Sequence, residues 1–228
     1  MTGVRLRGLV FDVDGVLLDS WGLMQHAMSH AHASCGAQGE VPVEAFRRQL
    51  GRPLPEIAEA LGLPPSFVEA YQATSRANVS MASLFEGVPE TLDELRSYGL
   101  KLALNTSKDR VRTEEMLSRF GIAQHFSAVI TANDVARGKP HPESLRKAAR
   151  AMELEPLEIA FVGDSPVDIQ CAHAAEVLPI AATWGMSTPE ELRAAGAQLI
   201  ISQIRDLTTL LGHLEDGGNL RVYEKRSH

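Results

Sequence analysis

The sequence predicts an α/β fold, in which a parallel sheet is covered by helices on both faces and an all-helical subdomain is inserted after the first strand. Short apolar runs alternate with amphipathic stretches of helical length, a rhythm typical of βαβ crossovers. One long interval, residues 21–85, has helical character throughout and contains no strand-like run. The length of 228 residues, 44% of them hydrophobic, suits a large domain that carries such an insertion.

The expected strands are short runs that contain β-branched residues. They are Leu9–Phe11, Leu102–Leu104, Ala128–Ile130, Ile159–Val162, Pro179–Ala182 and Leu199–Ile201. The expected helices of the core are Pro89–Tyr98, Val111–Phe120, Glu143–Met152, Val167–Ala175 and Pro189–Ala194. We therefore expect a core of residues 1–20 and 86–215 and a helical subdomain of residues 21–85. The polar, glycine-bearing residues 216–228 are expected to form a flexible tail.

Composition argues against several classes of function. A formal net charge of −7 disfavours nucleic acids and anionic membranes as partners, because phosphate groups attract basic surfaces. No apolar stretch is long enough for a membrane span or a signal peptide. The two cysteines, Cys35 and Cys171, are too few for a disulfide framework, which favours the cytoplasm. Walker-type and Gly-x-Gly-x-x-Gly phosphate loops are absent, which disfavours nucleotide-binding proteins.

Two aspartates, Asp12 and Asp14, close the first expected strand. Because side chains alternate along a strand, both project to the same side where the strand leaves the sheet. Burying uncompensated charge is unfavourable, so a bound cation or a chemical role is one interpretation. A solvated turn, in which Asp-Gly is common, is the other.

Polar residues follow the next strands as well. Thr106 and Ser107 follow the second strand, Lys139 the third, and Asp164 and Asp168 the fourth. Ligands of parallel α/β sheets bind beyond the carboxyl ends of the strands, so we expect one shared site. Individually, the lysine could be solvated and the segments after the second and fourth strands could simply cap helices. We also expect Thr106 or Ser107 to begin the following helix, with its N-terminal amides toward an anion.

These residue types suit phosphoryl transfer. Asp12 could be the nucleophile and, together with Asp164, a ligand of a hard divalent cation. Lys139 would neutralise charge on the nucleophile and the phosphate, and Thr106 would donate a hydrogen bond to a phosphate oxygen. Asp14 suits the general acid that protonates the leaving alcohol and later the base that activates water.

The chain closely resembles the haloacid dehalogenase-like (HAD-like) hydrolase superfamily, in the branch of phosphoglycolate phosphatase and β-phosphoglucomutase. Four motifs carry the resemblance in order: residues 12–20, Thr106, residues 139–143 and residues 163–169. The resemblance implies a Rossmann-like core with a helical cap. It also implies that Asp12 accepts the phosphoryl group and that Asp14 is the acid and base.

By the same resemblance, Mg²⁺ is bound by Asp12, the backbone carbonyl of Asp14 and Asp164, with Asp168 supporting this metal site. Dehalogenases carry no acid at the position of Asp14, and residues 21–85 contain no lysine for a Schiff base of the phosphonate-cleaving kind. Hydrolysis of a phosphate monoester is therefore favoured. The segment Ala174–Val177 stands in place of the usual Ala-Gly turn of the family, which leaves the end of that helix open.

Residues 21–85 are expected to select the substrate, because a closing lid excludes water and contacts the leaving group. By resemblance, Gly51 and Arg52 lie on the substrate-facing loop. Arg52, Arg47 or Arg48 could meet an anionic group of the substrate. A solvated helix face is the alternative for Arg47 and Arg48.

The first helix of this cap offers further candidates. Trp21 or His26 could contact a ring-bearing substrate. His26 and His30 have the spacing of a transition-metal pair, but no third ligand is evident, so ordinary polar histidines are favoured.

The predicted function is that of a Mg²⁺-dependent phosphatase that hydrolyses a small phosphate monoester through an aspartyl phosphate. Phosphoglycolate, a sugar phosphate and a secondary-metabolite intermediate are the candidate substrates. A phosphomutase of the β-phosphoglucomutase type is the nearest alternative, since the aspartyl phosphate can pass to a second hydroxyl group. A non-catalytic HAD-like regulator is a third possibility. We expect a monomer or homodimer.

Overall fold

A computed structural model of the chain describes residues 4–212 and 219–220, and it confirms the predicted α/β fold. Six parallel strands form one sheet in the order β6-β5-β2-β7-β8-β9. Their bounds are β2 (Gly8–Phe11), β5 (Lys101–Asn105), β6 (Ala128–Ile130), β7 (Ile159–Gly163), β8 (Leu178–Ala182) and β9 (Leu199–Ile201). Each expected strand is present. The strand order reverses beside β2, so the carboxyl end of β2 is the natural place for a ligand.

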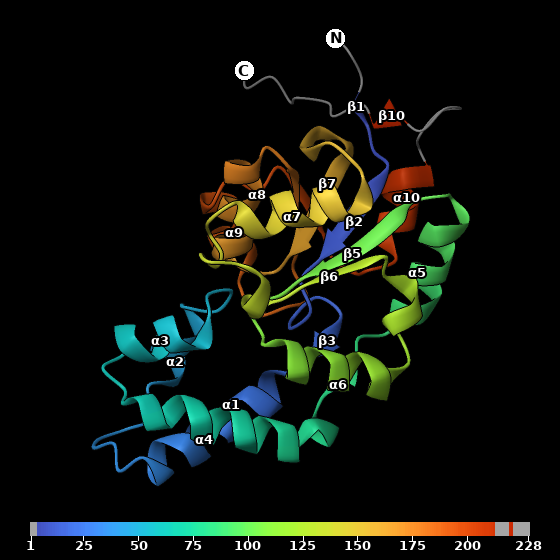
Figure 1. The fold of residues 1–228 in the computed structure, drawn as a ribbon. Helices are drawn as coiled ribbons and strands as arrows, with labels where there is room; N and C mark the ends of the chain where they lie inside the picture. Colours follow the sequence, from blue (N-terminus) through green and yellow to red (C-terminus); the bar gives the residue numbers. More distant parts are fainter. Residues whose placement is uncertain (1–3, 213–218, 221–228) are drawn as a thin grey trace.

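Helices cover both faces of this sheet (Figure 1). They are α5 (Val88–Ser97), α6 (Arg110–Phe120), α7 (Glu143–Met152), α8 (Pro166–Ala175), α9 (Pro189–Ala194) and α10 (Asp206–Gly212). Alternation along β2 builds the two layers. Leu9 and Phe11 belong to the core that includes α5, α6 and α10 residues, whereas Val10 packs with residues of α7 and α8.

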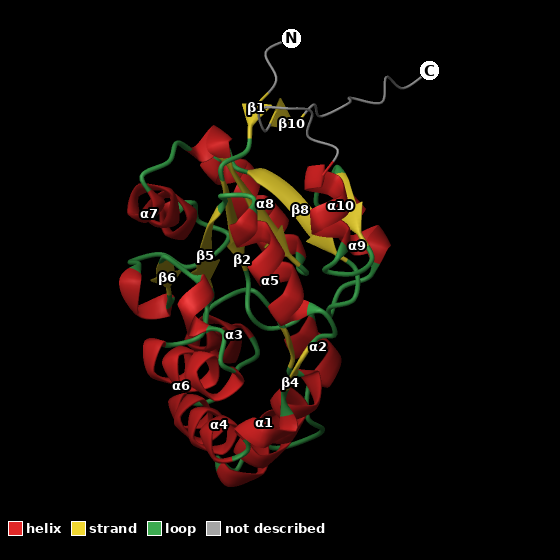
Figure 2. Ribbon diagram, turned by 90° about the vertical axis from the view of Figure 1, so that its right-hand side faces the viewer, coloured by secondary structure: helices red, strands yellow, loops and turns green. Residues whose placement is uncertain are grey.

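The inserted cap forms a separate helical lobe at the end of the sheet (Figures 1 and 2). It consists of α1 (Trp21–Ser34), α2 (Val43–Arg47), α3 (Leu54–Ala60), α4 (Pro65–Ala77) and a 3₁₀ turn, η1 (Val79–Met81). The lobe has its own apolar core, in which Tyr71 contacts the rings of Phe46 and Phe67. It therefore folds around a centre distinct from that of the sheet.

Two connections join the cap to the sheet domain. They are β3 (Leu18–Asp19) and β4 (Ser83–Leu84), which pair in antiparallel fashion. The sequence did not predict this pair, because strands of two residues carry no readable periodicity. The pairing holds both connections side by side, as a hinge between the two lobes.

The remaining elements are short. The 3₁₀ turns are η2 (Ala123–His125), η3 (Ala132–Asp134) and η4 (Pro156–Glu158), and β1 (Val4–Arg5) pairs with β10 (Asn219–Leu220). Apart from β10, the predicted flexible tail, residues 216–228, lies outside the described residues. Among the described helices, none combines the length and apolar character that a bilayer span requires.

The start of α6 corrects one expectation. Asp109, and not Thr106 or Ser107, caps this helix, because its carboxylate accepts a hydrogen bond from the Arg112 amide at 3.0 Å. Ser107 instead donates from Oγ to the Gly51 carbonyl at 2.5 Å. The side chains after β5 therefore face the cap, and a carboxylate already occupies the N-terminus of the helix.

The end of α8 gives a stability prediction. Glu176 takes a left-handed conformation, with φ 61° and ψ 33°, which is strained for any residue with a Cβ atom. We expect Glu176→Gly to raise the free energy of unfolding by about 0.5–1 kcal/mol. Urea unfolding monitored by circular dichroism measures the change. Glu190→Gly, within the right-handed helix α9, is the control and should lower the free energy of unfolding. A change of the same sign in both variants would contradict the argument.

Candidate active site

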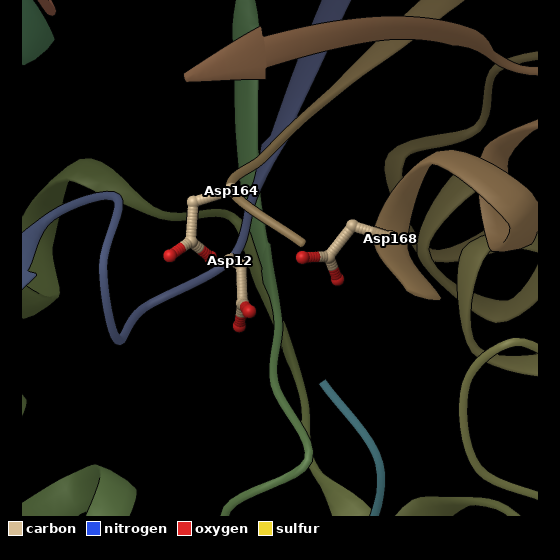
Figure 3. Close-up of side chains that lie close together, drawn as sticks. All are labelled: Asp12, Asp164 and Asp168. Atoms are coloured by element: carbon tan, nitrogen blue, oxygen red, sulfur yellow. The ribbon is translucent and has the colours of Figure 1, made fainter. Parts of the chain in front are cut away.

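The carboxyl ends of the strands bring the predicted site residues together. Asp12 follows β2, Thr106 follows β5 and Asp164 follows β7, while Lys139 comes from the segment before α7. All four are buried, with at most 6% of each residue exposed. Figure 3 shows Asp12 and Asp164 beside each other, with Asp168 at the start of α8 pointing toward them.

Three carboxylates share this small space with one ammonium group. Asp12, Asp164 and Asp168 each offer an oxygen within 4.8 Å of the others. Lys139 Nζ lies 3.0 Å from Asp12 Oδ2 and donates to Asp168 Oδ1 at 2.7 Å. The cluster keeps an excess of negative charge, and a buried excess of this kind favours a bound cation.

Asp168 has both carboxylate oxygens occupied. Oδ1 accepts from Lys139, and Oδ2 accepts from the Ser165 hydroxyl at 2.6 Å and from the Ser165 amide at 3.2 Å. Asp168 thus fixes Lys139 and completes the capping box of α8. Asp168 therefore caps a helix and also positions Lys139. Because the oxygens of Asp168 are occupied, Asp12 and Asp164 are the carboxylates that can face an ion.

Close backbone packing surrounds Asp164. Its Oδ2 accepts a hydrogen bond from the Met186 amide at 2.8 Å. Gly15 has φ +79°, and a Cβ atom there would lie 2.0 Å from Asp164 Oδ2. Glycine is therefore required at position 15 for two reasons: the backbone conformation is left-handed, and a side chain would collide with the Asp164 carboxylate. Hard carboxylate oxygens held in this way are the donors that Mg²⁺ prefers, so the residues present fit this ion.

Burial determines the protonation of the cluster. It raises the pKa of Asp12 to about 7, although Lys139 opposes the shift. Burial, Asp168 and Asp12 likewise raise the pKa of Asp164 well above its ordinary value. For Lys139, burial alone would lower the pKa, but the neighbouring carboxylates of Asp12 and Asp168 outweigh it and raise the pKa. The ammonium group stays charged between them.

Asp14 has a different environment, which the sequence did not reveal. Lys108 Nζ donates to Asp14 Oδ1 at 2.9 Å, and Ser20 Oγ donates to the same oxygen at 2.7 Å. Burial would raise the pKa of Asp14, but Lys108 and Ser20 outweigh it and the pKa is lowered. The pKa values of Asp12 and Asp14 are thus shifted in opposite directions, a pattern common where two carboxyl groups have different roles.

A pocket of about 70 Å³ opens above Asp12, between the cap and the sheet domain. Gly51 and Arg52 of the cap and Thr106 and Ser107 of the sheet domain line it. The pocket also contains two cationic residues that sequence reasoning missed, Lys108 and Arg112. The remaining lining residues are Asp14, Ser20, Leu23, Met24, Phe46, Leu50, Leu54, Ile57, Tyr71, Ser75, Asp164 and Met186.

The other cap candidates lie elsewhere. Trp21 lines a second cavity, of about 320 Å³, on the hinge side of the molecule. His26 is exposed on α1, outside the lining of the pocket above Asp12. His30 is exposed and its Nδ1 lies 3.0 Å from the Thr74 hydroxyl. Among the described residues, the acidic cluster is the one metal-competent group, and no histidine belongs to it.

Magnesium is expected to stabilise the folded protein more strongly as the pH rises from about 6 to about 8. The pKa of Asp12 is raised to about 7, so a proton competes with the ion below that value. Because folding raises this pKa, the metal-free protein loses stability as the pH rises from the ordinary carboxyl pKa of about 4 toward 7. Melting temperatures with MgCl₂ and with EDTA, compared across this range, test the expectation; a magnesium effect independent of pH would contradict it.

Comparisons with known proteins identify the family of the chain. The family model for haloacid dehalogenase-like hydrolases matches residues 9–182. A phosphoglycolate phosphatase of Pectobacterium atrosepticum is 30% identical over 221 residues, which cover 91% of this chain and 93% of that protein. A Dickeya dadantii protein named "Probable phosphatase IndB" is 31% identical over 212 residues, covering 87% of this chain and 90% of that protein.

The solved structures give the same result for the fold. A hydrolase from Pseudomonas syringae superposes with a TM-score of 0.82 over 90% of this chain and 98% of that chain, at 21% identity. The family model spans most of the chain, and the two relatives match nearly all of it. The chain therefore belongs to the haloacid dehalogenase-like hydrolase family.

Proposed function

We propose that the protein is a Mg²⁺-dependent phosphatase that hydrolyses the phosphate monoester of a small hydroxy acid through an aspartyl phosphate on Asp12. The observation that carries the proposal is the buried Asp12 carboxylate, held 3.0 Å from Lys139 at the floor of the pocket. The phosphatase names of the relatives support the same activity.

In the first step, a carboxylate oxygen of Asp12 attacks phosphorus while the bond from phosphorus to the ester oxygen breaks. The leaving oxygen takes a proton from Asp14, which would first have to acquire one despite its lowered pKa. In the second step, Asp14 accepts a proton from water as the water oxygen attacks phosphorus. This releases inorganic phosphate and restores the Asp12 carboxylate.

The surrounding side chains assist this displacement. Mg²⁺, bound by Asp12, Asp164 and the backbone carbonyl of Asp14, would neutralise the repulsion between carboxylate and phosphate. Lys139 reduces the charge on Asp12, and Asp168 holds Lys139 in place. Thr106, in the pocket wall, is placed to donate a hydrogen bond to a phosphate oxygen.

The charges in the pocket support a substrate that carries a second anionic group. Lys108 and Arg112 are buried in its wall, with 7% and 6% of each residue exposed, and Arg52 joins them from the cap. Lys108 already pairs with Asp14 at 2.9 Å and Arg112 with Asp109 at 2.5 Å, whereas Arg52 has no ion pair among the described residues. A carboxylate on the leaving alcohol would pair with Arg52, a partner that a neutral sugar does not offer. The relatives named phosphoglycolate phosphatase make 2-phosphoglycolate the first substrate to test.

Phosphate release from 2-phosphoglycolate, glucose 6-phosphate and p-nitrophenyl phosphate, each with MgCl₂ or EDTA, tests the proposal. We expect the highest kcat/KM for 2-phosphoglycolate, loss of activity in EDTA and recovery on adding MgCl₂. Full activity in EDTA would overturn the metal dependence, and a preference for the sugar phosphate would overturn the substrate class. Conversion of β-glucose 1-phosphate to an isomer without phosphate release would instead identify a phosphomutase.

We also infer that the protein acts in the cytoplasm. Both cysteines are free: Cys35 lies at the end of α1 in the cap and Cys171 is buried in α8. Unpaired thiols are typical of reducing compartments. Location of a tagged chain by cell fractionation would test this inference.

A further inference from the structure

We propose that Arg47 of the cap is a positioning residue for the metal ligand Asp164, so that closure of the cap completes the magnesium site. The inference rests on the magnesium site of the proposed function. It concerns a residue that lies outside the pocket above Asp12 and that sequence reasoning offered only as a substrate contact or a solvated side chain.

Arg47 is extensively hydrogen-bonded at the boundary between the two lobes. Its Nε and Nη2 donate to the two carboxylate oxygens of Glu44, both at 2.9 Å. Nη2 and Nη1 also donate to the two oxygens of Glu191, at 3.0 and 3.3 Å, and Nη1 donates to the Met186 carbonyl at 2.8 Å. These five bonds equal the five N–H groups of a guanidinium, so its orientation is fixed.

Those bonds cross from the cap to the sheet domain. Glu44 lies with Arg47 on α2, whereas Met186 and Glu191 belong to the segment that runs from β8 into α9. Glu191 in turn caps α9, since its carboxylate accepts from the Thr188 amide at 2.8 Å. Arg47 therefore binds this segment of the sheet domain at two points, the Met186 carbonyl and the Glu191 carboxylate that caps α9.

The same segment holds the metal ligand. The Met186 amide donates to Asp164 Oδ2 at 2.8 Å. A Cβ atom on Gly185 would lie 2.4 Å from that oxygen, so the backbone is in direct contact with the carboxylate. A shift of Met186 would remove the hydrogen bond that orients Asp164. Groups that orient a metal ligand in this way commonly set metal affinity.

Space behind the segment allows such a shift. The cavity of about 320 Å³ on the hinge side is lined by Gly185 and Met186, together with Arg47, Trp21 and Trp184. The segment is thus packed against Asp164 on one side and borders open space on the other. The bond from Arg47 to the Met186 carbonyl is suited to hold it in place.

Two other polar contacts between the lobes do not involve this segment. Arg76 of α4 pairs with Glu115 of α6, and Gln72 donates to Asp109 at 3.4 Å. Both contacts reach α6 or its N-cap residue, Asp109. Arg76 provides a matched control, because its removal deletes an ion pair between the lobes that does not involve Met186.

The test is isothermal titration of the metal-free full-length protein with MgCl₂ alone. For Arg47→Gln, we expect the Mg²⁺ dissociation constant to rise about tenfold, as for other residues that orient metal ligands. The kcat at saturating Mg²⁺ should change much less than the Mg²⁺ concentration needed for half-maximal activity. Glu191→Gln, which removes the carboxylate of the sheet domain that Arg47 binds, should also raise the Mg²⁺ dissociation constant.

Two controls make the outcome decisive. Arg48→Gln removes a neighbouring arginine that, among the described contacts, pairs only with Glu44. Arg76→Gln removes the ion pair between the cap and α6. Both variants should bind Mg²⁺ like the wild type. Unchanged binding by a folded Arg47→Gln protein would overturn the inference. Equal weakening by Arg76→Gln would assign the effect to cap closure in general. Failure of the wild type to bind Mg²⁺ would instead overturn the proposed metal site.

Discussion

Asp12→Asn is expected to lower phosphatase activity by about a thousandfold or more, the scale seen when a covalent nucleophile is removed. The amide has nearly the same shape as the carboxylate but cannot form the acyl phosphate, and it removes a ligand charge from the metal site. Phosphate release at saturating Mg²⁺ measures the loss. In addition, wild-type protein quenched during turnover should carry a hydroxylamine-sensitive phosphoryl group that the variant lacks.

The variant should fold as well as the wild type. Removing one of three clustered carboxylates relieves repulsion in a buried site, so the melting temperature in EDTA should stay equal or rise. Asp19→Asn, an exposed change in the hinge strand β3, is the control and should keep most activity. Substantial turnover by a folded Asp12→Asn protein would exclude Asp12 as the nucleophile.

Lys139→Met is expected to be the most destabilising single change in the site, by about 3–5 kcal/mol near neutral pH. Lys139 is 2% exposed, and its ammonium group contacts both Asp12 and Asp168. Without it, the buried carboxylates have no fixed cation beside them. Urea unfolding measures the loss of stability, and phosphate release should be abolished as well.

The loss should shrink at acidic pH, where the carboxylates can take up protons in place of the missing charge. Lys147→Met is the matched control: this lysine is 37% exposed and pairs with Glu143 on the surface of α7, so its loss should change stability by less than about 1 kcal/mol. A cost for Lys139→Met as small as that of the control would show that Asp12 and Asp168 do not depend on the ammonium.

The fold was predictable because the six strands of the main sheet and the helices α5 to α9 carry their own periodicity, whereas α10 was not predicted. The residues of the acidic cluster were predictable for a related reason, since Asp12 and Asp164 follow adjacent parallel strands and the carboxyl ends of such strands meet at one edge. The resemblance to a known family then gave each residue an expected role.

The features that sequence reasoning missed depend on contacts between distant segments. Lys108 and Arg112 belong to a strongly polar stretch that, taken alone, is typical of a solvated helix start. Both are buried, and Arg112 lies 6.0 Å from the ring centre of Tyr71 in the cap helix α4. The contacts of Arg47 were not predicted for the same reason, since Met186 and Glu191 are far away along the chain.

The placement of the two thiols allows movement of the cap to be followed by fluorescence. Cys35 is partly exposed in the cap, whereas burial raises the pKa of Cys171 in the sheet domain to about 11. A maleimide dye should therefore label Cys35 selectively, because the thiolate is the reactive form. Trp21 starts the helix that Cys35 ends, so its energy transfer to the dye should stay constant. Transfer from Trp184 in the sheet domain would change as the cap opens and closes.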